Sequence, residues 1–390
     1  MMDILRIKRN RPRHRSNASK NSSLMVFLPE ELLAEILLFF NVKTIMQLKC
    51  LSKSWLAFIS DSNFVEKHLK KSSQNPHLTL LWGYSDFNVV PYLVYRILKN
   101  PSINLCDSPK IPSINHRKFV GSCNGLLCLS YLDEFCLWNP ATRKISTKLG
   151  LLPNYIYNYP DLGYFNFTFG YDASTRVYKV IAFRANEIEG SLKSEVKVFS
   201  VGDNSWRNIE SFPVVPFNWL DHIYHRLRLT DGVHFNGTVN WLAEDMSIIS
   251  LYLSTETYKQ FLLPPGFDTV PFSQPVLRVL MDCLCFSYDS MKTEFVLWQM
   301  KQYGVHESWT QLFKISYQNL QMHNIDGSFQ LACLYVNGDM VIFANKSTQD
   351  SNQAYIYNLK DKTVERIKCR NKIQWSDNAM DYVESLVSVP

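Results

Sequence analysis

The chain of 390 residues is long enough for two or three domains and can bury a sizeable core. Hydrophobic residues make up 46%, charged residues 19% and aromatic residues 14% of the chain, values that exclude a wholly disordered, a collagen-like and a disulfide-scaffold protein. The most apolar stretch, residues 32–42, is shorter than the roughly 18 residues that a membrane helix needs and contains Glu35, so no membrane association is expected.

The net charge of +6 belongs to the amino-terminal end. Residues 1–20 hold seven Lys and Arg residues against Asp3 alone, so the rest of the chain sums to zero and offers no general affinity for nucleic acid. We expect a disordered basic arm over residues 1–23, with a nuclear-import patch or an organelle address as alternatives. Because no apolar secretory segment follows the arm, we expect a cytoplasmic or nuclear protein whose nine cysteines are reduced.

Helical periodicity is concentrated between Leu28 and Leu69. Pro29 suits a first helical turn, the apolar residues after it recur at helical spacing up to Asn41, and Asp61 starts the last of three or four short helices. About 40 residues cannot bury so many large apolar side chains by themselves. Part of this apolar surface must therefore face a partner or the rest of the chain.

This segment, LPEELLAEILLFFNVKTIMQLKCLSKSWLAFISDSNFVEKHL, resembles an F-box of the plant type. The resemblance rests on Leu28-Pro29, Ile36-Leu37, Val42-Lys43 and the block from Cys50 to Trp55. Family members often have Leu-Pro where this chain has Phe40-Asn41, but Asn is an accepted cap residue, so we expect the loop to be preserved.

The resemblance implies docking onto a Skp-type adaptor and, through it, a cullin-RING ubiquitin ligase. A cluster of apolar side chains around an aromatic anchor is also what a stable protein interface needs. The alternative is that these side chains, Trp55 among them, form only the internal core of a helical cap. The residues that the resemblance places on the adaptor-binding face are Leu28, Pro29, Ile36, Leu37, Val42, Leu48, Leu51 and Trp55.

From about Pro76 the pattern changes to short strands separated by turns. Asn-Gly, the strongest short hairpin signal, occurs at residues 124–125, 236–237 and 337–338, while residues 172–175 form a longer polar turn. One strand recurs at intervals of about 55 residues, a spacing typical of a four-stranded propeller blade. Its aromatic markers are Trp138, Phe199, Tyr252, Trp298 and Tyr357.

The repeat predicts a six-bladed β-propeller, with five blades or a β-sandwich as alternatives. The segment YVESLVSV at the carboxyl end is expected to pair with the strands LTLLWG and NVVPYLVYRI that follow the helices, because closing the ring removes exposed strand edges. The segments GSCNGLLCL and LWNPATRK also resemble the F-box-associated domain of plant F-box proteins, some of which are labelled kelch-repeat.

The predicted fold is thus a multidomain α+β chain, with a small all-α F-box before an all-β propeller. The predicted domains are the arm at 1–23, the F-box at 24–70, a linker at 71–77 and the F-box-associated propeller at 78–390. The function implied by the resemblance is that of a substrate-recognition subunit of an SCF-type ubiquitin ligase, with an unknown target protein. An adaptor-bound scaffold outside a ligase and a propeller hydrolase are the alternatives.

We expect no catalytic residues, cofactor or metal. The sequence lacks phosphate-binding loops and nucleophile elbows, and Thr310 replaces the second histidine of a zinc-protease motif that would begin at His306-Glu307. The densest cluster of titratable residues is Asp221, His222 and His225, interpreted as loop residues with substrate contact as the alternative.

Overall fold

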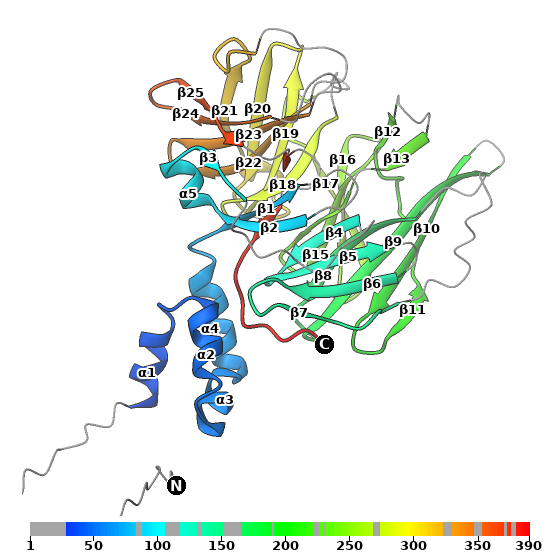
Figure 1. Cartoon of the computed structure of the whole chain (residues 1–390). Coiled ribbons are helices and arrows are strands. Elements are labelled where there is room, and N and C mark those ends of the chain that lie inside the picture. The colour runs from blue at the N-terminus through cyan, green and yellow to red at the C-terminus, as the bar shows by residue number, and fades with distance from the viewer. Residues whose placement is uncertain are drawn as a thin grey trace, which may run out of the picture.

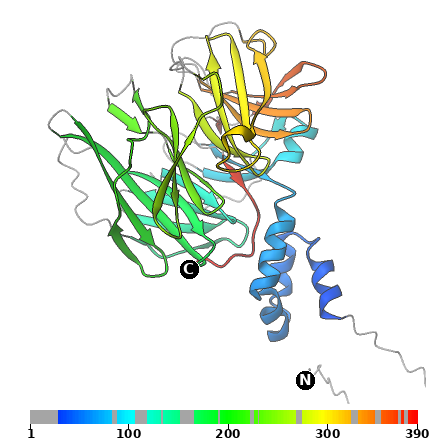
Figure 2. The same cartoon turned by 180° about the vertical axis from the view of Figure 1, so that it is seen from behind.

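The computed structural model shows a helical head attached to a β-propeller (Figures 1 and 2). It describes residues 29–82, 88–105, 118–131, 134–150, 165–188, 191–221, 226–229, 231–267, 274–322, 330–346, 353–369, 373–375 and 380–390. The predicted arm, Leu28, and His222 and His225 lie outside these ranges. In both views the carboxyl-terminal segment runs along the junction between the propeller and the head.

The head consists of four helices: α1 Glu30–Leu37, α2 Val42–Leu48, α3 Lys53–Ile59 and α4 Ser62–Ser72. Three of them begin at a side chain that caps free backbone amides, which is the usual way to start a short helix. Asn41 accepts from Thr44, Ser52 from Trp55, and Asp61 from the two amides at 63 and 64. The cap role expected for Asn41 is confirmed.

Five blades are four-stranded antiparallel sheets in which consecutive strands are neighbours. Blade 1 consists of β4 Lys118–Cys123, β5 Leu126–Tyr131, β6 Glu134–Asn139 and β7 Lys144–Ile145, and blade 2 of β8 Asn166–Asp172, β9 Val177–Ile188, β10 Ser191–Ser200 and β11 Ser205–Asn208. Blade 3 consists of β14 Val233–Phe235, β15 Thr238–Leu242, β16 Ser247–Tyr252 and β17 Thr257–Leu262, and blade 4 of β18 Val276–Leu280, β19 Cys283–Ser290, β20 Glu294–Met300 and β21 Trp309–Ser316. Blade 5 consists of β22 Gln330–Asn337, β23 Met340–Lys346, β24 Gln353–Asn358 and β25 Thr363–Arg366. The five aromatic markers all lie on the third strand of their blade, which confirms the repeat.

Blade 6 combines both ends of the propeller sequence. β1 His77–Trp82 pairs with β2 Asn88–Leu93 on one side, and with the short strands β27 Ile373–Gln374 and β28 Asp381–Tyr382 on the other. Closure by a composite blade is therefore confirmed. The segment that pairs with β1 lies earlier in the chain than predicted, because Tyr382 is the only residue of YVESLVSV that belongs to a strand. The second half of NVVPYLVYRI is wrong as a strand, because it forms helix α5 Val94–Lys99.

Three further features lie outside the blades. β3 Ser102–Ile103 and β26 Lys368–Cys369 form a short parallel pair, β12 Asn218–Asp221 and β13 Arg226–Leu229 form a hairpin between blades 2 and 3, and a 3-10 helix spans His306–Ser308.

The hairpin turns follow the sequence signals at two of the three Asn-Gly pairs. Asn124-Gly125 has φ values of 51° and 77°, and Asn236-Gly237 has 49° and 73°, the left-handed pair that a type I′ turn needs. The turn predicted at Asn337-Gly338 is shifted by one residue, because Asn337 pairs with Met340 at the end of the ladder. Blade 4 turns at Met281-Asp282, with φ values of 52° and 54°, a position without a clear turn signal in the sequence.

The core is divided into buried apolar clusters between neighbouring blades. For example, Phe183 of blade 2 packs edge-on against Trp241 of blade 3, with ring centroids 5.4 Å apart, and Trp241 is fully buried. A cluster of Val89 and Tyr382 from blade 6 with Leu127 from blade 1 joins the last blade to the first. The sheets therefore form a closed ring of six blades.

Candidate functional site

Helix α1 carries two apolar stripes that face in different directions. Leu33 and Leu37, four residues apart, pack into the head, and Leu37 is only 2% exposed. Leu32 and Ile36, one position earlier in each turn, are 52% and 46% exposed. Since residues four apart share a helix face, this helix has one side for the internal core and one for something else.

The internal core of the head is complete without the outer stripe. Leu37, Val42, Ile45, Ile59 and Phe64 form its buried centre, and Ile45 and Ile59 are fully inaccessible. A head that already has a packed core needs no further apolar side chains for its own folding. The remaining apolar side chains therefore need another explanation.

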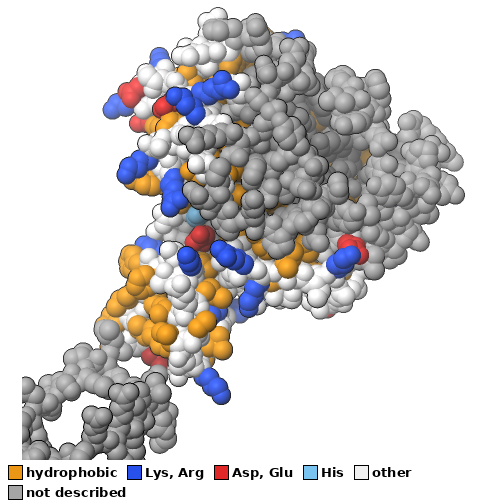
Figure 3. Space-filling model, in the orientation of Figure 1, with side chains coloured by type: hydrophobic (Ala, Val, Ile, Leu, Met, Phe, Trp, Pro, Cys, Tyr) orange, Lys and Arg blue, Asp and Glu red, His pale blue; other side chains and the backbone are white. Residues whose placement is uncertain are grey.

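The head exposes an unusual share of large apolar side chains. In the described part of the chain twelve such side chains are exposed, and six of them belong to the head. Figure 3 shows hydrophobic side chains gathered over the helices. We call these six residues the apolar face of the head: Leu32, Ile36, Phe39, Phe40, Leu51 and Leu56. Contiguous exposed apolar surface marks an interaction site in a folded protein.

The carboxyl-terminal segment joins the head to the propeller. Leu386 is 4% exposed and packs with Leu37 and Val42, and Ala141 from the β6–β7 turn lies beside them. The carboxylate of Glu384 accepts from the backbone amide of Val42 at the start of α2, and burial raises its pKa. The carboxyl-terminal segment therefore contributes both an apolar and a polar contact to the junction.

Comparison with known proteins identifies both parts. The F-box domain model matches residues 27–67, and the model of the F-box associated beta propeller domain matches residues 86–389. The chain belongs to the F-box proteins with an F-box-associated propeller. In Arabidopsis thaliana, an F-box/kelch-repeat protein is 27% identical over 74% of this chain and 79% of its own length, and F-box protein CPR1 is 28% identical over 75% and 73%.

Seven of the eight predicted adaptor-binding residues of the F-box lie in the described part of the chain and fall into three groups, whereas Leu28 lies outside it. Pro29, Ile36 and Leu51 are exposed, and Leu48 and Trp55 are half-buried. Leu37 and Val42 are 2% and 1% exposed in the core of the F-box. These two side chains cannot touch a partner in this conformation, and their place is in the internal core that the sequence analysis kept as an alternative.

Four residues of the apolar face were not selected from the sequence: Leu32, Phe39, Phe40 and Leu56. The signal that could have found Leu32 is the double stripe on α1, where Leu32 and Ile36 are offset by one position from Leu33 and Leu37. Phe39 and Phe40 lie in the turn after α1, where helical periodicity no longer indicates a direction.

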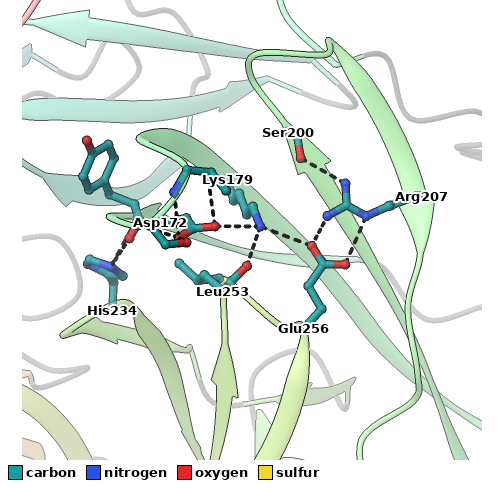
Figure 4. Close-up of polar contacts among 10 residues, drawn as sticks. Asp172, Lys179, Ser200, Arg207, His234, Leu253 and Glu256 are labelled. Carbon is teal, nitrogen blue, oxygen red and sulfur yellow. Dashed lines mark hydrogen bonds and ion pairs between the residues drawn. The ribbon is translucent and has the colours of Figure 1, made fainter.

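The F-box-associated propeller contains a buried ion cluster between blades 2 and 3 (Figure 4). The ammonium of Lys179 lies 3.2 Å from the Asp172 carboxylate and 3.3 Å from that of Glu256, and it donates to the carbonyl of Leu253. Glu256 also pairs with Arg207. Every charge in the cluster has an opposite charge beside it, and the cluster joins blade 2 to blade 3.

Asp172 is the acid at the centre of this cluster. Burial alone raises the pKa of its carboxyl, but hydrogen bonds from Ser174, Thr175 and Lys179 outweigh burial and lower the pKa to about 2. The carboxylate is therefore ionised and fully engaged at neutral pH. Among the described residues no group of three or more His, Cys, Asp or Glu side chains has metal-binding geometry, and no helix could cross a membrane.

Proposed function

We propose that this F-box protein is the substrate-recognition subunit of an SCF-type ubiquitin ligase. The observation that carries the proposal is the apolar face of the head, six exposed large side chains beside a core that is already complete. A partner that covers this face removes apolar surface from water at about 25 cal/mol per Å². Membership in the F-box family supports a Skp-type adaptor as that partner, and cullin-RING would follow through it.

The adaptor interface is assigned to the exposed residues of the F-box. Ile36 and Leu51 make the direct contacts together with Leu32 and Phe40, and Trp55 lies half-buried at the border. Leu37 and Val42 lie in the core of the F-box and hold these exposed residues in position. Because aromatic and large aliphatic anchors near the centre of an interface dominate its affinity, the loss of two such side chains is expected to abolish binding.

The propeller presents the target protein. Catalysis then consists of proximity, because holding a target near the ubiquitin-charged enzyme raises the effective concentration of its lysines. The chain itself supplies no catalytic residue, cofactor or metal in this scheme, and the protein acts in the cytoplasm, the nucleus or both.

The test is capture of a purified Skp homologue by the full chain. Ile36→Asp with Leu51→Asp places two charges on the apolar face, and we expect at least a 30-fold loss of affinity with an unchanged thermal unfolding midpoint of the propeller. Leu262→Asp is the matched control, because Leu262 is an equally exposed leucine, at 63%, on strand β17 of the propeller. Wild-type affinity in the double variant would refute the assignment.

The same experiment separates a ligase subunit from a scaffold. With cullin added, a ligase subunit retains cullin through the adaptor, and the double variant loses both. Adaptor binding without cullin would favour the scaffold.

A further inference from the structure

A cleft of about 780 Å³ lies between the head and the propeller. Its head side consists of the α1–α2 turn at Phe39 and Phe40 and the end of α4 at Lys71. Its propeller side consists of β1, β2 and α5 of blade 6, the β6–β7 turn of blade 1 and the carboxyl-terminal segment. The volume falls in the range of small-molecule sites and is too small for a folded partner.

The lining of this cleft is rich in positive charge. Lys71, Arg96 and Arg143 reach it from α4, α5 and the β6–β7 turn, and none of the three forms an ion pair with a described residue. Among the described residues of the lining the one acidic residue is Glu384, whose carboxylate is engaged by the amide of Val42. Figure 3 shows a histidine and an acidic side chain at the narrow junction, with Lys and Arg side chains around them. Three cations against one engaged carboxylate favour an anionic occupant.

The cleft also has aromatic walls and weakly partnered polar atoms. Tyr92, Trp138 and Tyr382 line it, and the Tyr382 side chain is 1% exposed. The hydroxyl of Tyr382 and Nδ1 of His77 are buried without a well-aligned hydrogen bond, and the nearest polar groups are backbone groups of Ala141 and Asn75. Buried polar atoms of folded proteins are almost always well paired, so these two atoms leave hydrogen-bonding capacity for a further group.

We propose that this cleft binds a small molecule with two or more phosphate or carboxylate groups. Its anionic groups pair with Arg96, Arg143 and Lys71, and the rest of the molecule lies against the aromatic wall. Arginine binds both kinds of group with two parallel hydrogen bonds. Because the walls come from both the head and the propeller, the bound molecule also fixes the orientation of one relative to the other. The cleft shares Phe39 and Phe40 with the apolar face, but binding of the small molecule does not require the ligase function.

The test uses the purified full chain and isothermal titration calorimetry. Pyrophosphate and tripolyphosphate supply adjacent phosphates, citrate supplies carboxylates, and inorganic phosphate supplies a single anion for comparison. We expect a dissociation constant in the micromolar range for at least one multivalent anion, and binding of inorganic phosphate at least ten times weaker. A preference for the phosphates or for citrate decides the anionic group.

The variant Arg96→Ala with Arg143→Ala is expected to weaken this binding at least tenfold. Both side chains are exposed, so their loss leaves the fold intact, which the thermal unfolding midpoint checks. Lys301→Ala with Lys360→Ala removes two exposed cations outside the cleft and should bind as the wild type does. An equal loss in both double variants, or no binding of any multivalent anion at 1 mM, would overturn the proposal. Binding of an acidic peptide but not of the small anions would replace it with a peptide site.

Discussion

The side-chain amide of Asn139 donates a hydrogen bond of 3.1 Å to the backbone carbonyl of Ser385, 246 residues further along the chain. The same amide donates to the carbonyl of Val387 at 2.9 Å, and its oxygen accepts from the amides of Ala141 and Thr142. Asn139 is fully buried. One side chain thus shapes the β6–β7 turn and holds the carboxyl-terminal segment whose Leu386 enters the core of the F-box.

Asn139→Leu is therefore expected to lower the free energy of unfolding by about 2–4 kcal/mol. The substitution keeps the volume but leaves buried backbone groups without partners, and each such group costs about 1–3 kcal/mol. The control is Asn358→Leu, because Asn358 also ends a third strand and caps its turn, at the amides of Lys360 and Asp361, but lies far from the tail. Chemical denaturation that gives equal losses for the two variants would contradict a special role for the tail bonds.

A second prediction concerns Leu386, the residue of the carboxyl-terminal segment (the tail) that lies in the core of the F-box. Leu386→Ala removes a buried side chain, and burial of this kind is worth about 2–5 kcal/mol. Because the lost contacts join the head to the propeller, we expect faster proteolysis between α4 and β1 and a larger radius of gyration in solution scattering. Val389→Ala is the matched control, since Val389 packs against the cluster of blades 1 and 2 and, among the described residues, is not part of the core of the head. A cleavage rate equal to that of the control would show that the tail does not hold the head.

The turns show how far local sequence determines this propeller. Asn124-Gly125 and Asn236-Gly237 turn where predicted because both residue types accept positive φ at low cost. Met281-Asp282 adopts the same positive φ values although methionine, unlike aspartate, does not favour them, so the pairing of β18 with β19 must impose the turn at Met281. Strand periodicity and a few turn residues were enough to predict the blade repeat. The residues at which each hairpin turns depend on the pairing of the two strands that it joins.

The candidate site could be predicted only in part, for a similar reason. The helical segment and its apolar excess follow from the sequence, but which side of α1 faces inward depends on what packs there. Leu37 packs against its neighbours in the head and also against Leu386 from the far end of the chain, and no local pattern contains that last contact. The cleft is likewise built from segments far apart in sequence.

A third prediction concerns the pH dependence of stability through His77. Burial lowers the pKa of His77 to about 4, from 6.5 in the unfolded chain. Between these values the unfolded chain binds more protons, so stability falls as the pH drops from 6.5 toward 4, by up to about 3 kcal/mol. Burial raises the pKa of Glu384, so protonation of Glu384 offsets part of this loss of stability at the low end of the pH range.

The measurement is chemical denaturation of the wild type and of His77→Gln at pH 7.5, 6 and 5. The variant keeps a polar side chain but cannot titrate, so its stability should fall less between pH 7.5 and 5, by about 1–2 kcal/mol. Parallel curves for the two proteins would mean that His77 takes up its proton equally well in the folded chain.

The last prediction concerns Lys179, the cation that joins blades 2 and 3. Its side chain is 6% exposed and lies between Asp172 and Glu256, so Lys179→Met leaves two carboxylates with one cation fewer in a buried place. Removing one partner of a buried ion pair costs about 3–5 kcal/mol, whereas an exposed pair is worth about 0–1 kcal/mol. The control is Lys314→Met, which breaks the more exposed pair with Glu294 on blade 4. Adding Asp172→Asn to Lys179→Met removes the uncompensated charge and should recover part of the loss in thermal unfolding, since the two residues act as a unit. If the losses of the two substitutions simply added, the contact between Lys179 and Asp172 would contribute nothing to holding the blades together.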